Sequence, residues 1–380
     1  MSKHWPMVKL GEVLRHRKEF ITIDDLTNYK RPRVQLHVQG IVLRDDVPGA
    51  LIKTKTQQVC RAGEFLVAEI DAKVGGFGIV PESLNGSIVS SHYFLFVIDE
   101  AKLNLRFLDF FIRTPAFREQ VAAQGTTNYA AIRPAHVLGY EIPLPPLTEQ
   151  RRVVTQIEKL AAQIYEARTL RHQSVEEAEV LLRSILTHDG QAKPTPMREL
   201  VKLRPPDVAV RADETYQFAG VYCFGRGVFK SVRKSGMDFA YPRLTRIRAG
   251  EFVYPKLMAW EGALGVVPPE CDGCVVSTEF PVFEVNQKRV LPEVLDTYFR
   301  TPSVWPEIAG ESTGTNIRRR RLNPQDFLDY EMPLPSMETQ VTLREVRAEV
   351  DALKRLQAET AAELDALLPA ILDKAFKGEL

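Results

Sequence analysis

Long apolar runs are missing from this sequence. No stretch reaches the roughly 18 apolar residues of a transmembrane helix, and the first residues, Met1–Pro6, lack the apolar core of a secretory signal. Cysteine is scarce, because only four occur in 380 residues, too few for a disulfide framework. We therefore expect a globular protein of a reducing cytoplasm.

A strong excess of charge of either sign is lacking as well. The formal net charge is +1, which by itself does not predict binding to nucleic acid. The charge is unevenly distributed, however: segments 1–147 and 191–336 together carry +5, whereas segments 148–190 and 337–380 together carry −4. This pattern gives modest support to two polyanion-binding domains on a neutral or acidic scaffold.

Motifs for nucleotide or cofactor chemistry are absent. The sequence has no Gly-x-x-x-x-Gly-Lys-Ser/Thr loop for a nucleoside triphosphate. A methyltransferase would need an Asn/Asp-Pro-Pro-aromatic motif, but Pro205-Pro206 is followed by Asp207 and Pro145-Pro146 by Leu147. The seven histidines are scattered, so we predict no catalytic residues.

One cysteine pair has the spacing of metal ligands. Cys271-Asp272-Gly273-Cys274 would supply two ligands, but a tetrahedral zinc site needs two more, and no second Cys or His pair follows. The sequence therefore predicts no metal site.

What the sequence does contain is a repeat about half its length. Ala62-Gly63-Glu64-Phe65 returns at 249–252, and Arg113-Thr114-Pro115 returns at 300–302, both 187 positions later. Ile142-Pro143-Leu144-Pro145 returns as Met332-Pro333-Leu334-Pro335, 190 positions later. Repeats of this length are longer than solenoid units and indicate duplicated domains. Two similar domains suggest a ligand with two similar parts.

Each copy begins with a mixture of strands and helices. Short β-type runs at 34–38, 63–67 and 93–98 are separated by glycines and prolines. A helix is expected at 105–112 and its counterpart at 292–299, each ended by a Thr-Pro step. The predicted fold class is therefore α+β, with two tandem domains at 1–147 and 189–336.

A long helix is expected after each α+β domain, at 148–188 and 337–380. Apolar residues recur there at alternating spacings of three and four, the pattern of a coiled coil. They are Val153, Ile157, Leu160, Ile164, Leu181 and Ile185 in the first helix, and Leu343, Val346, Val350, Leu353, Leu364, Leu367 and Ile371 in the second. We expect the two helices to form an antiparallel coiled coil, with the domains related by a pseudo-twofold axis. The alternative is two independent helical hairpins, each packed on its own domain.

The repeated elements resemble a known family. Each domain is closed by Ile/Met-Pro-Leu-Pro and a helix that starts with Glu149-Gln150 or Thr339-Gln340. Gly125-Thr126-Thr127-Asn128 and Gly314-Thr315-Asn316 precede the two closures, and residues 371–380 read Ile-Leu-Asp-Lys-Ala-Phe-Lys-Gly-Glu-Leu. In this order and in duplicate, these elements resemble the specificity subunit of type I DNA restriction-modification enzymes.

The resemblance implies a non-catalytic DNA-binding subunit of a bacterial or archaeal cytoplasm. In that family each α+β domain is a target-recognition domain that reads one half of a split double-stranded DNA sequence, and the coiled coil spaces the two domains. Two modification subunits would carry adenine-N6 methylation with S-adenosylmethionine. Restriction subunits would carry translocation and cleavage with ATP and Mg²⁺. This chain would itself bind no cofactor.

Residues that differ between the copies are the candidates for sequence-specific contacts. Arg318, Arg319, Arg320 and Arg321 stand where the first copy has Tyr129-Ala130-Ala131-Ile132, and arginine can bind phosphates or guanine edges with two hydrogen bonds. The other candidates are Arg31, Arg33, Arg44, Lys53, Lys55, Lys230, Arg233, Lys234, Thr126, Thr127, Asn128, Thr315 and Asn316. A solvated surface charge or a helix cap is the alternative for each.

Two other functions are compatible with the sequence. The chain could belong to a related system in which one partner carries both methylation and cleavage, or it could be a two-headed protein-interaction scaffold that binds no DNA. Steep salt dependence of DNA binding would separate a DNA-binding subunit from such a scaffold, because phosphate contacts release counterions.

Overall fold

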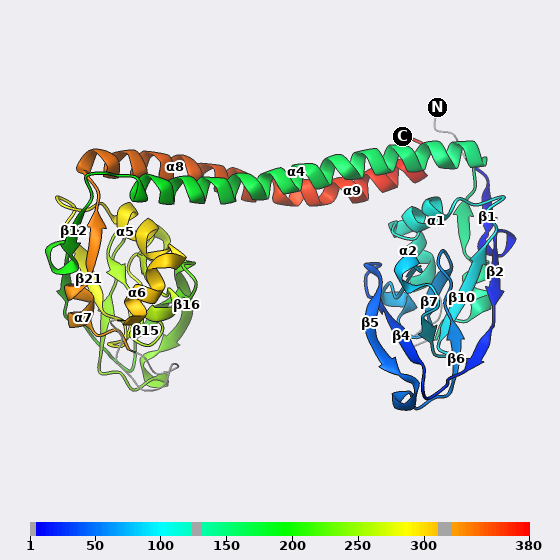
Figure 1. Cartoon of the computed structure of the whole chain (residues 1–380), viewed down its shortest axis with the longest axis horizontal. Coiled ribbons are helices and arrows are strands. Elements are labelled where there is room, and N and C mark those ends of the chain that lie inside the picture. The colour runs from blue at the N-terminus through cyan, green and yellow to red at the C-terminus, as the bar shows by residue number, and fades with distance from the viewer. Residues whose placement is uncertain (1–4, 124–130, 311–320) are drawn as a thin grey trace. The chain divides into compact units, whose positions relative to one another are not determined.

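The computed structural model describes residues 5–123, 131–310 and 321–380. It divides into two compact units, the first formed by 1–169 with 360–380 and the second by 170–359 (Figure 1). Each unit contains one α+β domain, here called a head, and the adjoining parts of the long helices. The first head extends to about residue 146, and the second covers about residues 188–336. The first head precedes the central long helix, and the second head follows it.

Short strands build the first head. β1 (Met7–Lys9) pairs with β11 (Glu141–Pro143), so the two ends of the head are joined. The central sheet has the order β2 (Leu14–Arg17), β10 (Tyr93–Ile98), β7 (Phe65–Ala68) and β8 (Phe77–Ile79). A second sheet has the order β3 (Phe20–Thr22), β6 (Thr56–Val59) and β9 (Ile88–Val89). β4 (Asn28–Gln35) and β5 (Gly40–Pro48) form a long hairpin.

The helices of the first head are α1 (Leu105–Phe111), α2 (Pro115–Ala122) and α3 (Pro134–Gly139). Asn104 caps α1 by accepting a hydrogen bond from the backbone N–H of Phe107, and Thr114 caps α2 in the same way. Aromatic side chains of the sheet and the helices form the core: Phe65, Phe77, Phe96, Phe107 and Phe117 are each at most 1% exposed. This core holds α1 and α2 against the central sheet.

The second head repeats this order of elements. Its strands are β12 (Lys193–Pro196), β13 (Val201–Arg204), β14 (Val208–Ala209), β15 (Thr215–Tyr222), β16 (Gly227–Ser235), β17 (Arg243–Arg246), β18 (Phe252–Val253), β19 (Gly265–Val266), β20 (Val275–Val276), β21 (Val282–Val285) and β22 (Glu331–Leu334). Its helices are α5 (Pro292–Phe299), α6 (Trp305–Gly310) and α7 (Pro324–Asp329). β12 pairs with β22, and the central sheet runs β13-β21-β18-β19, as in the first head. The predicted fold of two similar α+β domains is confirmed.

The two heads differ in how their long hairpins are attached. In the second head, β14, β17, β20, β15 and β16 form one five-stranded sheet, because Phe218 of β15 pairs in parallel with Val275 of β20. In the first head, the β4–β5 hairpin is a separate two-stranded sheet. The framework is therefore shared, whereas the hairpin is set differently in each copy.

One strand predicted in the first head ends earlier than expected. The sequence predicted a strand over 34–38, but β4 stops at Gln35 and the chain turns back. His37 and Val38 both have a φ of 58°, and their backbone N–H groups donate to the carbonyls of Val74 and Gly75. These tertiary hydrogen bonds hold two non-glycine residues in the left-handed region, which apolar periodicity does not reveal.

The central long helix is continuous, and the C-terminal one is not. α4 spans Leu147–Thr187, whereas the C-terminal segment consists of α8 (Met337–Glu359) and α9 (Ala361–Phe376), separated at Thr360. Pro369 also lies inside α9 and removes one backbone donor from that helix. The two halves of the repeat therefore end in helices of different regularity.

Within each unit the helices run antiparallel. In the first unit, Arg152 donates to the carbonyl oxygen of Leu380 at 2.8 Å, and Arg168 pairs with Asp365 at 2.7 Å. In the second unit, Gln357 donates to Ser174 at 3.1 Å, and Lys354 pairs with Glu179. In both units the residue numbers rise along one helix as they fall along the other, which confirms the antiparallel pairing.

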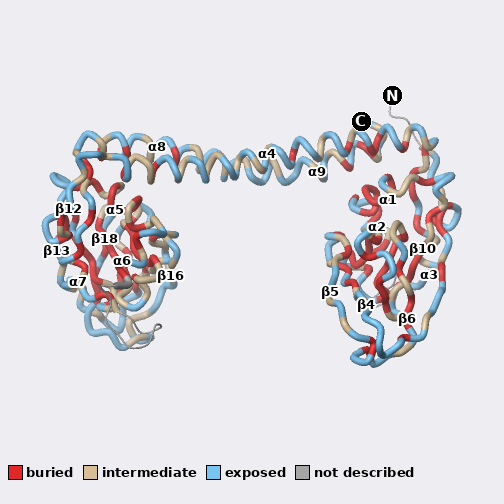
Figure 2. The backbone as a smooth tube through the Cα atoms, in the orientation of Figure 1, coloured by how far each residue is buried: buried red, intermediate tan, exposed pale blue. Residues whose placement is uncertain are grey.

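Burial along the helices is greatest where they meet the heads. Val153, Ile157 and Ile164 of α4 and Leu343 and Val350 of α8 are at most 8% exposed, while Leu160, Ile185, Val346, Leu353, Leu364 and Ile371 are partly buried. No residue of α4 from Tyr165 to Leu181 is buried (Figure 2). Much of the apolar surface of the helices is thus covered by the heads.

Two residues predicted to lie in the coiled-coil seam are exposed. Leu181 and Leu367 are 51% and 45% exposed, whereas the next residue in each helix, Leu182 or Leu368, packs against the core of the adjoining head. A one-residue shift turns the buried stripe by about 100°. The heptad pattern therefore changes phase where the partner surface changes from a helix to a head.

Candidate nucleic-acid interface

Basic side chains gather on the long hairpin of each head, but on different strands. In the first head, Arg31 and Arg33 lie on β4, and Arg44 lies on β5. In the second head, Lys230, Arg233 and Lys234 lie on β16, while β15 carries no Lys or Arg. The repeat places the two hairpins at equivalent points of the fold, so one structural element carries a different charge pattern in each copy.

The arginine nearest the middle of β4 is paired within its own hairpin. The backbone register places Arg31 opposite Asp45 of β5, and their side chains form two hydrogen bonds of 2.7 Å. This pairing raises the pKa of Arg31 and lowers the pKa of Asp45 below its usual range. Arg44 also lies 3.4 Å from Asp45. Arg33 is exposed and forms no ion pair with the described residues. A ligand could therefore bind Arg33 without breaking an ion pair, unlike Arg31.

The two lysines after β5 differ in the same way. Lys55 pairs with Asp25 and donates to the carbonyl oxygen of Gly49 at 2.8 Å, so it ties two loops together. Lys53 is exposed, and no ion pair joins it to the described residues. Of this pair, Lys53 has the charge that a ligand could reach without breaking an existing contact.

On β16 the positive charges are not compensated. Lys230 and Arg233 lie opposite Ala219 and Gln217, and Lys234 lies opposite Tyr216. All three basic side chains are exposed, and none forms an ion pair with the described residues. Three neighbouring cations without an acid across the hairpin repel one another, so an anionic ligand would relieve that repulsion. β16 is therefore a better candidate than β4 for binding an anionic ligand.

Sequence reasoning missed an exposed aromatic group at the turn of this hairpin. Tyr222 stacks on Phe229 with a centroid distance of 3.8 Å, and the guanidinium of Arg226 lies 4.7 Å from the centre of the Tyr222 ring. Phe224 is 64% exposed and has a φ of 62°, although it is not glycine. Aromatic faces beside an arginine can stack on nucleobases. Two aromatics interleaved with Gly225 and Arg226 were the sequence signal for this group.

Arg321 is the described member of the predicted arginine run. It pairs with Glu279, while Leu322 donates its backbone N–H to the carbonyl of Lys256. In the first head, Ile132 makes the matching backbone hydrogen bond to the carbonyl of Glu69, and the neighbouring Arg133 pairs with the Glu69 side chain at 2.6 Å. These contacts fix the chain just after the two undescribed segments. Arg318, Arg319, Arg320, Thr315, Asn316, Thr126, Thr127 and Asn128 lie outside the described residues.

The cysteine pair of the second head is buried. Cys271 and Cys274 are at most 2% exposed, and burial raises the pKa of the Cys271 thiol to about 11. Among the described residues, no group of three or more His, Cys, Asp and Glu is placed to hold a metal ion. In that same part of the chain, no helix is long and apolar enough to cross a membrane.

The fold defines a class of protein with two similar α+β heads, each joined to antiparallel helices. No family model and no curated protein matches the sequence. Solved structures do match. The HsdS subunit from Thermoanaerobacter tengcongensis is 24% identical, with a TM-score of 0.59 over 100% of this chain and 98% of that one. A chain from work on complex assembly and conformational transition of the type I R-M system is also 24% identical, with a TM-score of 0.65 over 100% and 99%. The chain thus has the fold of HsdS specificity subunits over its whole length, which confirms the predicted resemblance.

Proposed function

We propose that this chain is the non-catalytic specificity subunit of a type I restriction-modification complex. It would bind a double-stranded DNA sequence in two parts separated by a spacer, with one part read by each head. The observation that carries the proposal is the pair of equivalent hairpins with unlike exposed charges. A shared framework with different surfaces is what two different half-sites require.

The described contacts rank the candidate DNA-binding residues. Arg31, Lys55 and Arg321 already pair with Asp45, Asp25 and Glu279, so they support the local fold first. Arg33, Lys53, Lys230, Arg233 and Lys234 are exposed without such partners, and we assign DNA contacts to them. Arg318–Arg320 remain candidates for contacts of the second head.

The chemistry would reside on partner subunits. Two modification subunits would bind this chain and methylate adenine N6 with S-adenosylmethionine. Restriction subunits would add ATP- and Mg²⁺-dependent translocation and cleavage. The complex would act in the cytoplasm of a bacterium or archaeon.

DNA binding tests this proposal directly. The purified chain, alone and with its methyltransferase partner, should bind duplex DNA with an affinity that falls steeply with salt, because Lys and Arg displace counterions from phosphates. Neutralising Arg318–Arg320 together should weaken binding or relax one half-site and leave the other unchanged. A chain that binds the partner but shows no salt-dependent DNA affinity would be a protein scaffold instead.

A further inference from the structure

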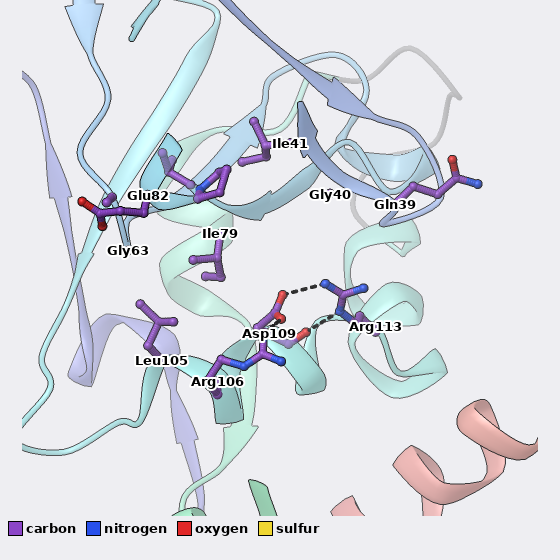
Figure 3. Close-up of a pocket in the computed structure, with 13 residues that line it drawn as sticks. Gln39, Gly40, Ile41, Gly63, Ile79, Glu82, Leu105, Arg106, Asp109 and Arg113 are labelled. Atoms are coloured by element: carbon purple, nitrogen blue, oxygen red, sulfur yellow. Dashed lines mark hydrogen bonds and ion pairs between the residues drawn. The ribbon is translucent and has the colours of Figure 1, made fainter. Parts of the chain in front are cut away.

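Each head contains a cleft at the same place. It lies between α1 and the turn before β7 in the first head, and between α5 and the turn before β18 in the second. In the first head the cleft lies beside α1 and has a volume of about 530 Å³ (Figure 3). In the second head it lies beside α5 and has a volume of about 400 Å³. Volumes of this size can hold one or two side chains of a binding partner.

Part of the wall of each cleft is built from residues that the repeat preserves. Ten aligned positions line both clefts, and six of them are identical: Ala62 and Ala249, Gly63 and Gly250, Val80 and Val267, Pro81 and Pro268, Asp109 and Asp296, Arg113 and Arg300. Ile79 and Val266 differ by one methylene group. The sequence motifs that revealed the duplication therefore converge on one cleft in each head.

An acid and an arginine form the polar end of each cleft. In the first head, Asp109 is 7% exposed and accepts hydrogen bonds from Arg113 at 2.9 Å and from Arg106 at 2.6 Å (Figure 3). In the second head, Asp296 is 10% exposed and lies 2.8 Å from Arg300 Nε. That contact is too poorly aligned for a hydrogen bond, and this Nε has no hydrogen-bond partner among the described residues.

Neutralising the buried acid does not explain why this arginine is repeated. Asp109 has a second partner in Arg106, but the residue aligned with Arg106 is Glu293. Asp296 has its second partner in Arg347 of α8, but the aligned residue of α4 is Ile157. The second cation thus comes from α1 in the first copy and from α8 in the second, whereas Arg113 and Arg300 occupy the same position in both. Their side chains are 40% and 30% exposed, so they present donors to the cleft.

We propose that these clefts are two equivalent docking sites for one segment of the modification subunit, which binds once in each head. The segment carries an apolar side chain next to a carboxylate. The apolar side chain enters the part of the cleft lined by Ile79 or Val266, and the carboxylate binds the free donors of Arg113 or Arg300. Two similar sites on heads with different exposed hairpins match two identical partners on two different half-sites. The inference rests on the function proposed above.

The experiment measures partner binding with the full chain. Arg113→Gln, Arg300→Gln and the double variant are each titrated with the co-expressed adenine methyltransferase subunit, and the complexes are weighed by native mass spectrometry. Each single variant should lower the affinity of one of the two bound copies by about tenfold or more, and the double variant should lower both. Arg118→Gln is the control, because Arg118 is exposed on α2 and does not line the cleft.

The outcomes separate this inference from the proposed function. If both single variants and the double variant bind two copies as tightly as the wild type, the docking sites are elsewhere and the inference is overturned, although the specificity subunit stands. If the wild-type chain binds no methyltransferase, the proposed function falls as well. Circular dichroism should show unchanged folding, since Asp109 keeps Arg106 and Asp296 keeps Arg347.

Discussion

The side chain of Gln150 accepts a hydrogen bond from the backbone N–H of Asn104 at 2.8 Å and thereby joins the start of α4 to the start of α1. Its amide also donates to the carbonyls of Lys102 and Pro145, each at 2.8 Å, and the residue is fully buried. Gln340 repeats this pattern in the second unit with Leu291, Arg289 and Pro335. One glutamine in each copy therefore fixes the long helix to its head.

Replacing either glutamine with leucine should destabilise the adjoining head. Gln150→Leu keeps most of the volume but leaves one N–H and two carbonyls without partners, and we expect a loss of about 3 kcal/mol of unfolding free energy. Urea denaturation, with hydrogen exchange to resolve the two heads, measures the loss. Gln163→Leu is the matched control, because Gln163 is exposed on α4 and should change stability by less than about 0.5 kcal/mol. Equal effects at both positions would refute the assigned role.

Two aligned tyrosines should respond in opposite ways to loss of the hydroxyl. The Tyr140 hydroxyl is buried without a hydrogen-bond partner among the described residues, and burial raises its pKa to about 12. The Tyr330 hydroxyl contacts that of Tyr298 at 2.7 Å and donates to Glu307 at 2.8 Å. Tyr140→Phe should leave the melting temperature unchanged or raise it, whereas Tyr330→Phe should cost about 1–2 kcal/mol. A larger loss at Tyr140 would contradict this assignment.

A largely buried arginine, Arg347, aligns with the buried Ile157 of the first copy where α8 meets its head. Arg347 is 12% exposed and lies 3.1 Å from Asp296 and 3.2 Å from Asp351. Burial alone would lower its pKa, but the charges of Asp296 and Asp351 outweigh burial and raise it. Arg347→Leu should cost about 2 kcal/mol, less than for an acid left unpaired, because Asp296 keeps Arg300.

The control for Arg347 removes its more exposed partner. Asp351 is 50% exposed, so Asp351→Asn should change stability by less than about 0.5 kcal/mol. Thermal unfolding of the two variants compares them directly. If Arg347→Leu were as harmless as Asp351→Asn, the ion pair would not hold α8 on α5.

The basic strand of the second head should set part of the salt dependence of DNA binding. Each phosphate contact contributes about 0.9 to the slope of log affinity against log salt, so Lys230→Gln, Arg233→Gln and Lys234→Gln together should reduce the slope by roughly 2–3. Fluorescence anisotropy over a salt series measures it. The control removes three exposed lysines elsewhere on the second head, Lys193, Lys202 and Lys288, and should leave the slope nearly unchanged. An equal reduction in both triple variants would mean that the charge acts only through the overall field.

The duplicated motifs were enough to predict two α+β heads and antiparallel helices, because a repeat and a heptad are properties of sequence spacing. Which charged side chains form ion pairs and which stay exposed was not predictable from the sequence. Arg31 meets Asp45 only because β4 ends at Gln35 and sets the hairpin register. That turn depends on hydrogen bonds that the backbone N–H groups after β4 donate to the carbonyls of Val74 and Gly75. The periodicity also could not show that Leu182 replaces Leu181 in the buried stripe, because the surface of the head decides this.

The sequence also showed that certain residues are repeated without showing which contacts they make. Gln150 and Gln340 were recognised as matched helix starts, but their three hydrogen bonds come from segments about 50 positions away or nearby in the closing turn. Arg113 and Arg300 were seen as members of Arg-Thr-Pro motifs. Only the structure places them at the edge of equivalent clefts.

Sequencing of adenine methylation in DNA modified by this chain and its methyltransferase partner shows whether each head reads one half-site. We expect one methylated motif made of two specific parts, separated by a spacer of fixed length and unspecified sequence. Replacing the second head, residues 189–336, with the corresponding head of a related subunit should change one part of the motif only. A continuous motif, or a change in both parts after exchange of one head, would contradict the assignment of one half-site to each head.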